Sequence, residues 1–317
     1  MVIDVFPFSN ELDILEIRLN ILDKFVDKFI LIEAKFTHSG VEKELLFEKN
    51  KERFKRFLPK IEHIVIDNFD KAYPLDSYEL YKVDLGRAAM IKNNPEMWKR
   101  ENYQREYAKD ILKNYPKDAI VLINDVDEIP NFDLADFSSI DKEPVAFEST
   151  SYVYYLNGYT GVKMNFTTRA FLNSNIYSPH TQRYLPIKKV IKNGGWHFSS
   201  VGTLPEILTK YFSVVPHSVN EIVPDHDRAY MFLRHGLGLS DTGFNFELVD
   251  IDNTFPKYIE DKQDKYSHII GKKENLEVST DDTEFLRKEL IRLRKIYNQT
   301  LMENNELKWR DRPGSNR

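Results

Sequence analysis

The sequence predicts an α/β protein with a mostly parallel central sheet, and three observations lead to that prediction. Short apolar runs alternate with amphipathic segments through the first half of the chain, as strands alternate with helices in such folds. Residues 119–123, Ala-Ile-Val-Leu-Ile, form the most apolar short run and indicate a strand buried on both faces. Hydrophobic residues make up 41% of the 317 residues, so a core of ordinary size can be buried.

The elements follow from apolar periodicity taken in chain order. Strands are expected where apolar residues run together, at residues 2–6, 29–32, 61–66 and 119–123, with β-rich sequence from 144 to 155. Helices are expected where apolar residues recur every three or four positions. These helices cover residues 12–26, 50–58, 76–93, a segment opened by Pro95, 203–213, 225–237 and 283–305. We expect an α/β domain over residues 1–275, then a C-terminal helical extension and polar tail over 276–317.

Composition excludes several classes of protein. The net charge is −5 with both signs interspersed, unlike the basic face of a nucleic-acid-binding protein. The absence of cysteine excludes a disulfide scaffold and a cysteine-ligated zinc site. We find no signal peptide and no apolar run of about 18 residues that would span a membrane, so we expect a soluble, cytoplasmic protein. The sequence leaves the oligomeric state open.

The strongest chemical signal is the pair Asp125 and Asp127, which follows the most apolar strand. Ligands of open α/β sheets bind at the carboxyl ends of parallel strands, and residues two apart in extended backbone point to one side. Two carboxylates in one small volume repel each other unless a cation joins them. Mg²⁺ or Mn²⁺ takes such oxygen ligands and keeps positions open for substrate phosphates. We therefore expect a metal–phosphate site here.

Three other interpretations of this segment stay open at this point. A solvated turn with helix-capping carboxylates has the same residues. A phosphatase of the haloacid-dehalogenase type also begins with a buried strand and two spaced aspartates, the first of them a nucleophile. That motif usually stands near the N-terminus, whereas three expected strands precede it here. A non-catalytic sugar-binding module is the third possibility.

Several blocks together resemble glycosyltransferase family 17, the family of β-1,4-mannosyl-glycoprotein N-acetylglucosaminyltransferase, in its bacterial and viral form. The resemblance covers roughly residues 3–240 and rests on Asn10-Glu11-Leu12-Asp13, Arg18, Glu33, Lys43, Arg100-Glu101, Gln104-Arg105, Asp125-Val126-Asp127-Glu128-Ile129-Pro130, Gly195-Trp196-His197-Phe198-Ser199 and His217. It implies a GT-A-type fold and inverting transfer from a UDP-sugar donor, UDP-GlcNAc above all, to a glycan acceptor. Animal members carry a membrane anchor and cysteines, which this sequence lacks.

The resemblance and the spacing together suggest roles for the candidate residues. Asp127 is the expected catalytic metal ligand, and Asp125 is expected to contact the metal or the donor ribose. His197 follows two glycines and is the expected third metal ligand, although a half-buried packing role suits it as well. The metal would neutralise charge on the departing diphosphate.

Further donor contacts are expected from Asn10, Glu11, Glu33, Lys43 and Arg105, while capping or surface roles are the alternatives for the first four. Arg105 also stands four residues after Glu101, in the favourable order for an ion pair along a helix. The base that accepts the acceptor's proton is expected to be Glu128, with Glu148 and Asp227 as alternatives.

Overall fold

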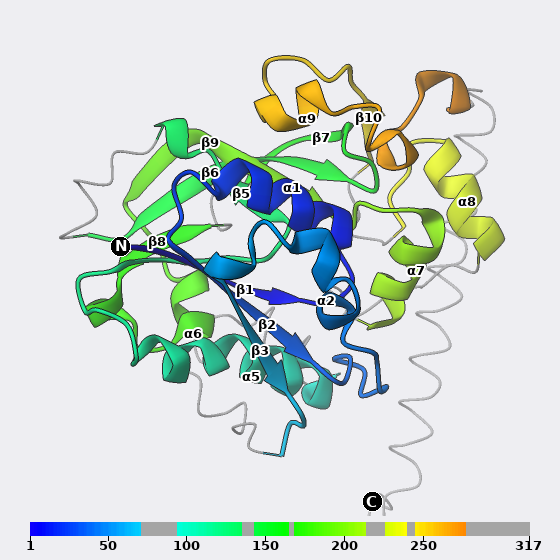
Figure 1. Cartoon of the computed structure of the whole chain (residues 1–317). Helices are drawn as coiled ribbons and strands as arrows, with labels where there is room; N and C mark the ends of the chain where they lie inside the picture. Colours follow the sequence, from blue (N-terminus) through cyan, green and yellow to red (C-terminus); the bar gives the residue numbers. More distant parts are fainter. Residues whose placement is uncertain (71–93, 135–142, 165–167, 214–225, 240–244, 277–317) are drawn as a thin grey trace, which may run out of the picture. The chain divides into compact units, whose positions relative to one another are not determined.

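The computed structural model describes residues 1–70, 94–134, 143–164, 168–213, 226–239 and 245–276. Within these ranges the chain is a mixed α/β structure built around one ten-stranded sheet (Figure 1). The strands are β1 (Val2–Phe8), β2 (Lys28–Ala34), β3 (Ile61–Ile66), β4 (Ile120–Ile123), β5 (Glu128–Pro130), β6 (Val145–Val153), β7 (Gly158–Met164), β8 (Arg169–Leu172), β9 (Lys189–Ser199) and β10 (Glu247–Leu248).

The sheet has a parallel part and a mixed part. Its order is β10-β7-β6-β8-β4-β1-β2-β3, and β9 pairs with both β5 and β6. Strands β3, β2, β1 and β4 are parallel neighbours, so their carboxyl ends share one edge. Beyond β4 the pairs are antiparallel, except for β6 with β9. The expected mostly parallel sheet is therefore correct only for the N-terminal strands, because β6 to β8 follow one another without intervening long helices.

Helices cover both faces of the parallel strands. The α-helices are α1 (Leu12–Leu22), α2 (Leu46–Lys49), α5 (Pro95–Leu112), α6 (Pro179–Tyr184), α7 (Leu204–Ser213), α8 (His226–Arg234) and α9 (Lys257–Asp261). Short 3₁₀ turns lie at Lys51–Phe54, Leu58–Lys60, Phe132–Leu134, Asn173–Asn175, Ser267–Ile269 and Lys273–Asn275. Helix α1 packs on one face of the sheet and α5 on the other (Figure 1).

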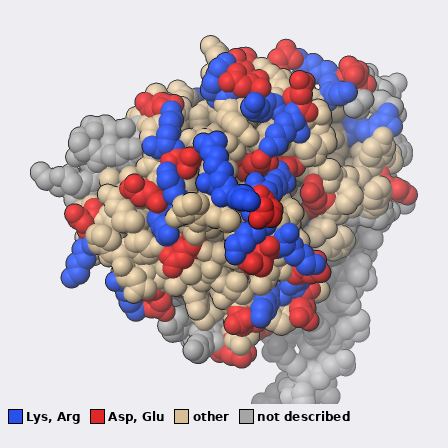
Figure 2. Space-filling view, viewed as in Figure 1, with Lys and Arg blue, Asp and Glu red and all other residues tan. Residues whose placement is uncertain are grey.

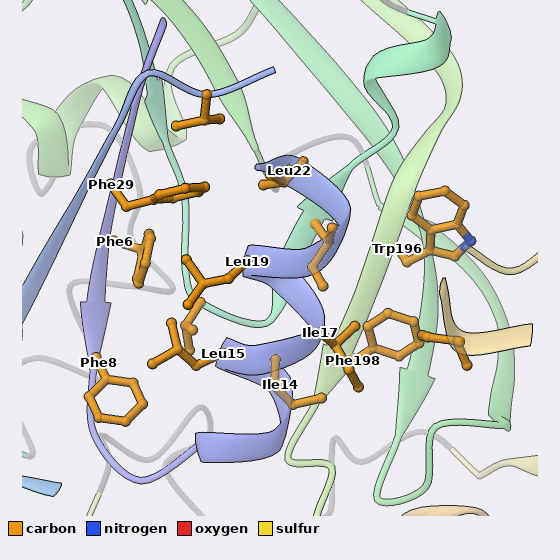
Figure 3. Close-up of a cluster of buried hydrophobic side chains, with 14 of the residues drawn as sticks. Phe6, Phe8, Ile14, Leu15, Ile17, Leu19, Leu22, Phe29, Trp196 and Phe198 are labelled. Carbon is orange, nitrogen blue, oxygen red and sulfur yellow. The ribbon is translucent and has the colours of Figure 1, made fainter. Parts of the chain in front are cut away.

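Alternation along β1 builds the two core layers. Phe6 and Phe8 join Leu15 and Leu19 of α1 in one buried cluster, which Figure 3 shows at the α1 face. Ile3 and Val5 join the α5 cluster instead. Because both faces are covered, β1 is buried almost throughout, and its end is held firmly at the sheet edge where the motif lies.

Within the described residues most element predictions are confirmed, with one difference. Helix α5 begins at Pro95 as expected, since proline suits the first turn of a helix. Residues 50–58, expected as one helix, form 3₁₀ turns on either side of a short break instead. Pro59 contributes to this break, because it cannot donate the backbone hydrogen bond that a continuing helix needs. The helices expected at 76–93 and 283–305 and the polar tail lie outside the described residues.

The chain divides into two compact units. The first spans residues 1–216 and 246–271 and contains the whole sheet; the second spans 217–245 and 272–317 and contains α8. The boundary expected after residue 275 stays a prediction. Lys and Arg side chains are interspersed with Asp and Glu over the face seen in Figure 2, which matches the mixed charge pattern of the sequence. No helix in the described part of the chain is long and apolar enough to cross a bilayer.

Candidate active site

The motif Asn124 to Glu128 forms a tight loop between β4 and β5. The backbone N–H of Glu128 donates to the Asp125 carbonyl, and the Asp125 N–H donates to Glu128 Oε2 at 2.8 Å. Val126 is buried in the α1-face cluster and anchors the loop from inside. The loop thus lies at the carboxyl end of the parallel strands, as the sequence predicted, and its polar side chains are directed by neighbouring charges.

Strand β9 brings the second sequence block against the motif. Glu128 pairs with His197, Ile129 with Trp196 and Pro130 with Gly195 in an antiparallel ladder. A Cβ on Gly195 would lie 2.5 Å from the Ile129 carbonyl oxygen, so only glycine lets the two strands approach this closely. The two blocks quoted from the sequence are therefore one structural unit. Trp196 is largely buried and donates its indole N–H to the Thr254 carbonyl.

A buried arginine holds the loop from below. Arg18 of α1 has no exposed surface and forms a bidentate pair with Asp4 of β1, with bonds of 2.8 and 2.6 Å. It also donates to the Asn124 side chain and to three carbonyls of the motif, among them Glu128 O at 2.7 Å. The N–H groups of Arg18 donate to oxygen atoms of the loop. A loop of another shape would not place these oxygens within reach. The backbone course of the motif therefore depends on α1 and β1.

One side of the motif is held by two arginines, and we call it the arginine side. Arg105 of α5 donates to both oxygens of Asp125 and also contacts Glu101. Arg183 of α6 donates to Asp125 Oδ2 at 2.8 Å and to both oxygens of Glu128, one of them at 2.6 Å. Burial raises the pKa of Asp125, but the two guanidinium groups outweigh it and hold that pKa well below its usual range.

The other side carries Asp127 and is called the lysine side. Lys210 of α7 places its ammonium 2.9 Å from Asp127 Oδ2 and 3.2 Å from Glu11 Oε1. The second oxygen of Asp127 faces His197 Nε2 at 3.7 Å. Burial raises the pKa of Asp127, yet Lys210 and His197 together hold it below its usual value. Asp127 is thus ionised, with its Oδ2 in contact with Lys210 and its Oδ1 facing His197.

A small hollow lies beside Lys210. Its lining comes from the loop after β1, the start of α1, the turn after β9 and α7, and includes Asn10, Glu11, Ser200, Glu206 and Lys210. Glu11 closes this wall by accepting the N–H groups of Ser9 and Asn10 through its Oε2. Two of the expected donor contacts, Asn10 and Glu11, therefore line a concave surface beside Asp127.

The other expected donor contacts lie elsewhere or have internal partners. Glu33 is fully buried and accepts from the Leu46 N–H at 2.7 Å, from Lys43 and from His63 at 3.0 Å. Lys43 is 16% exposed and pairs with Glu33. Arg105 lies on the arginine side. The polar groups around Glu33 thus bond to one another and do not extend the site at the motif loop.

The alternative bases have different surroundings. Glu148 of β6 pairs with Lys192 at 2.6 Å, and Lys192 draws the pKa of Glu148 below its usual value. Asp227 belongs to the second unit and is almost fully exposed. His217, one of the blocks of the resemblance, lies outside the described residues.

A divalent cation has two side-chain donors available beside the hollow. Asp127 Oδ1 and His197 Nε2 face each other, whereas both oxygens of Asp125 are taken by arginines. Among the described residues no group of three or more His, Cys, Asp or Glu side chains is gathered that could hold a metal ion. Mg²⁺ and Mn²⁺ sites commonly use one or two protein donors and complete their shell with phosphates and water. The residues therefore fit an ion that binds together with a phosphate ligand.

Three residues important to the site carried no role in the sequence-based prediction: Arg18, Arg183 and Lys210. Arg18 was noted only as part of a sequence block, and its periodicity is that of an ordinary helix residue. Arg183 lies 58 residues from Asp125, and Lys210 lies 83 residues from Asp127. No local pattern marks either one, since each is brought to the motif only by the fold.

Comparison with known proteins identifies the family. No curated protein matches the chain. A family model described as Glycosyltransferase family 17 matches residues 1–213, which include the motif loop, β9 and the whole of α7. That span is well over half of the chain and carries the arrangement described above. The chain therefore belongs to glycosyltransferase family 17, and glycosyl transfer is the activity that this family indicates.

Proposed function

We propose that this chain is an inverting glycosyltransferase with a GT-A-type fold that uses Mn²⁺ or Mg²⁺. By its resemblance to the family, its donor is a UDP-sugar, UDP-GlcNAc above all, and its acceptor is a hydroxyl of a glycan. Family membership supports transfer of a sugar. The parallel strands that end at the motif support a nucleotide site at that edge, since ligands of such sheets bind there.

The observation that carries the proposal is the position of Asp127. Its carboxylate contacts Lys210 of α7, which also lines a hollow, while the neighbouring Asp125 is held by arginines. A diphosphate bound there would meet the Lys210 ammonium. Preorganised positive charge of this kind stabilises a departing diphosphate without reorganisation during the reaction.

The cation would be held by Asp127 and His197. When bound, it would neutralise charge that develops on the leaving diphosphate. The chain's own residues do the remaining work: Arg18 fixes the loop, Arg105 and Arg183 hold Asp125 and Glu128 in place, and Glu11 forms the wall of the hollow. In inverting transfer the acceptor oxygen bonds to the anomeric carbon as the bond to the diphosphate breaks, and a carboxylate takes the hydroxyl proton.

The identity of that carboxylate stays a prediction. Glu128 is 1% exposed and both of its oxygens contact Arg183, an arrangement that supports a role in holding the loop. A base at Glu128 would need Arg183 to move when substrate binds. The Glu128→Gln variant discussed below separates the two roles.

The phosphatase alternative has less support. Its nucleophile would be Asp125, the first aspartate of the motif, and a nucleophilic carboxylate must reach the phosphorus atom. Asp125 accepts from two arginines, and the family match is to glycosyltransferases. A non-catalytic sugar-binding module is also less supported, because Asp127 and His197 still face each other beside the hollow.

One panel of nucleotides tests the proposal. Purified protein is mixed with UDP, GDP and CDP and with their sugars, each with and without Mn²⁺. Thermal shift and donor hydrolysis are then measured. We expect UDP to raise the melting temperature only when Mn²⁺ is present, and UDP-GlcNAc to be hydrolysed slowly under the same condition. No response to any nucleotide would contradict the proposal, and release of phosphate from a generic phosphomonoester would support the phosphatase instead.

A further inference from the structure

The ammonium of Lys210 stands where a cation is expected beside the motif. It lies between Asp127 Oδ2 and Glu11 Oε1, at 2.9 and 3.2 Å, and the side chain is 16% exposed. Within α7 only Ile207 is buried. The carbonyls of Glu206 and Ser213 accept from Asn10 and Ser39, and Lys210 links the helix to Asp127 of the motif.

The charges on the lysine side do not balance. Two carboxylates, Asp127 and Glu11, share a single lysine, so one negative charge is left over when His197 is neutral. The remaining negative charge favours a further cation. However, a divalent ion on Asp127 would stand close to the ammonium on the same carboxylate, and like charges at such a distance repel strongly in a partly buried site.

A diphosphate removes this conflict. Its oxygens carry negative charge and accept hydrogen bonds, so they offer the ammonium new partners when it leaves the carboxylates. Glu11 and Lys210 both line the hollow beside α7. A lysine side chain has four rotatable bonds, and its ammonium can move between neighbouring anions without moving the helix.

We propose that Lys210 is an exchangeable counterion: it occupies Asp127 and Glu11 before substrate binds, and transfers to the donor diphosphate when the divalent cation takes Asp127. The exchange makes metal binding and nucleotide binding depend on each other. It rests on the metal-dependent transfer proposed above and adds to it the residue that couples the two ligands. By linkage, nucleotide must then raise metal affinity by the same factor by which metal raises nucleotide affinity.

The test is a Mn²⁺ titration without nucleotide, in which free Mn²⁺ is read from its EPR signal. Wild type is compared with Lys210→Gln, which removes the charge but keeps a hydrogen-bond donor, and with Lys210→Arg, which keeps the charge. We expect Lys210→Gln to bind Mn²⁺ at least about fivefold more tightly than wild type, within the usual range of coupling between sites. Lys210→Arg should bind it as weakly as wild type. Equal or weaker binding by Lys210→Gln overturns the exchange.

A second arm repeats the titration with saturating UDP. We expect UDP to tighten Mn²⁺ binding more in wild type than in Lys210→Gln, because only wild type has an ammonium to transfer. An equal effect of UDP in both proteins overturns the coupling role. Lys192→Met is the matched control, since Lys192 also pairs with a carboxylate but at Glu148, away from the motif, and it should change neither arm.

Failure of the proposed function gives a different result. If wild type binds no UDP with or without Mn²⁺, the donor assignment is wrong, yet the nucleotide-free titration still decides whether Lys210 competes with the ion. Thermal melting of each variant shows that it is folded. If Lys210→Gln is unstable, Mn²⁺ binding is compared between Lys210→Arg and wild type alone. Much tighter Mn²⁺ binding by Lys210→Arg would then contradict a competition between the two positive charges.

Discussion

The two sides of the motif loop use charge in opposite ways. On the arginine side, Asp125 and Glu128 meet Arg105 and Arg183 through several short hydrogen bonds, and the guanidinium groups are 10% and 6% exposed. On the lysine side, Asp127 meets one ammonium and one imidazole beside a hollow. The first arrangement is made of bidentate contacts, whereas the second is made of single contacts that a ligand can replace.

This difference indicates which charged side chains have a structural role and which can bind a ligand. Bidentate arginine pairs are rigid, and removing one partner leaves a buried charge that is very costly. A lysine is a point charge on a flexible stem and can change partners. We therefore expect changes on the arginine side to lower stability, and changes on the lysine side to alter ligand binding and turnover at nearly constant stability.

The largest expected effect is that of Arg183→Met. It leaves Asp125 with one arginine and leaves Glu128 almost completely buried without its guanidinium partner. Breaking a buried pair in this way costs about 3–5 kcal/mol of unfolding free energy. Urea unfolding of the protein measures this loss of unfolding free energy. Arg56→Met is the control, because Arg56 is 70% exposed and pairs with Asp23 at 3.3 Å. A loss no larger than that of the control would show that the arginine side is not structural.

Asp127→Asn comes next and acts on the lysine side. We expect transfer to fall by about 10²–10³-fold, the range for loss of one preorganised electrostatic group. The free energy of unfolding should change by less than about 1 kcal/mol. Asn has the same shape as Asp, and Lys210 still has its ion pair with Glu11. Initial rates with UDP-GlcNAc and urea unfolding give the two numbers. Asp133→Asn, which alters an exposed pair with Lys24, is the control, and equal rates for both variants would contradict a role for Asp127.

Glu128→Gln separates a proton acceptor from a structural residue. If Glu128 is the base, transfer should be lost by about 10²-fold or more while binding of UDP and stability are kept. If it mainly holds Arg183, stability falls as well, since the pair is then weakened. Glu148→Gln is made alongside, because Glu148 is the alternative base on the described part of the sheet. Normal turnover of Glu128→Gln would exclude it as the base.

The smallest expected effect is on the pH dependence of stability. The pKa of Asp125 is depressed in the folded state, so its contribution is present above the unfolded pKa of about 3.9 and is lost as pH falls toward the folded value. Below about pH 4 the unfolded chain binds a proton that the folded chain does not. Wild type should therefore lose up to about 1 kcal/mol more per pH unit than Asp125→Asn. Urea unfolding between pH 5 and pH 3 measures the slopes, and parallel curves would contradict the assignment.

The sequence allowed the position of the motif to be predicted because that position depends on local signals. The apolar run before Asp125 identifies a central strand, and the carboxyl end of such a strand is where ligands bind. Gly195 instead allows the close pairing of β9 with β5, an approach between strands that the sequence did not indicate. The strands expected at 2–6, 29–32, 61–66 and 119–123 and the helix that begins at Pro95 were confirmed, because their apolar periodicity is a local signal.

Partners of the motif were not predictable in this way. Lys210 is one of many lysines in amphipathic helices, and only the path of the chain after β9 brings it to Asp127. Glu33 was expected at the donor because it ends a parallel strand, but the chain after β2 returns and covers it with Lys43 and the Leu46 N–H. The antiparallel pairing of the strands after β4 also escaped prediction, since a β-rich sequence does not show which strands pair.

The pairing of Arg18 with Asp4 and Asn124 has a consequence for how the protein is assembled. These residues are separated by 14 and 106 positions, and the motif loop takes its course from them. During synthesis the loop leaves the ribosome long after β1 and α1, which can already be in contact. A fragment that starts after α1 would contain both aspartates and both glycines of β9, yet it would lack the arginine around which the loop is wound.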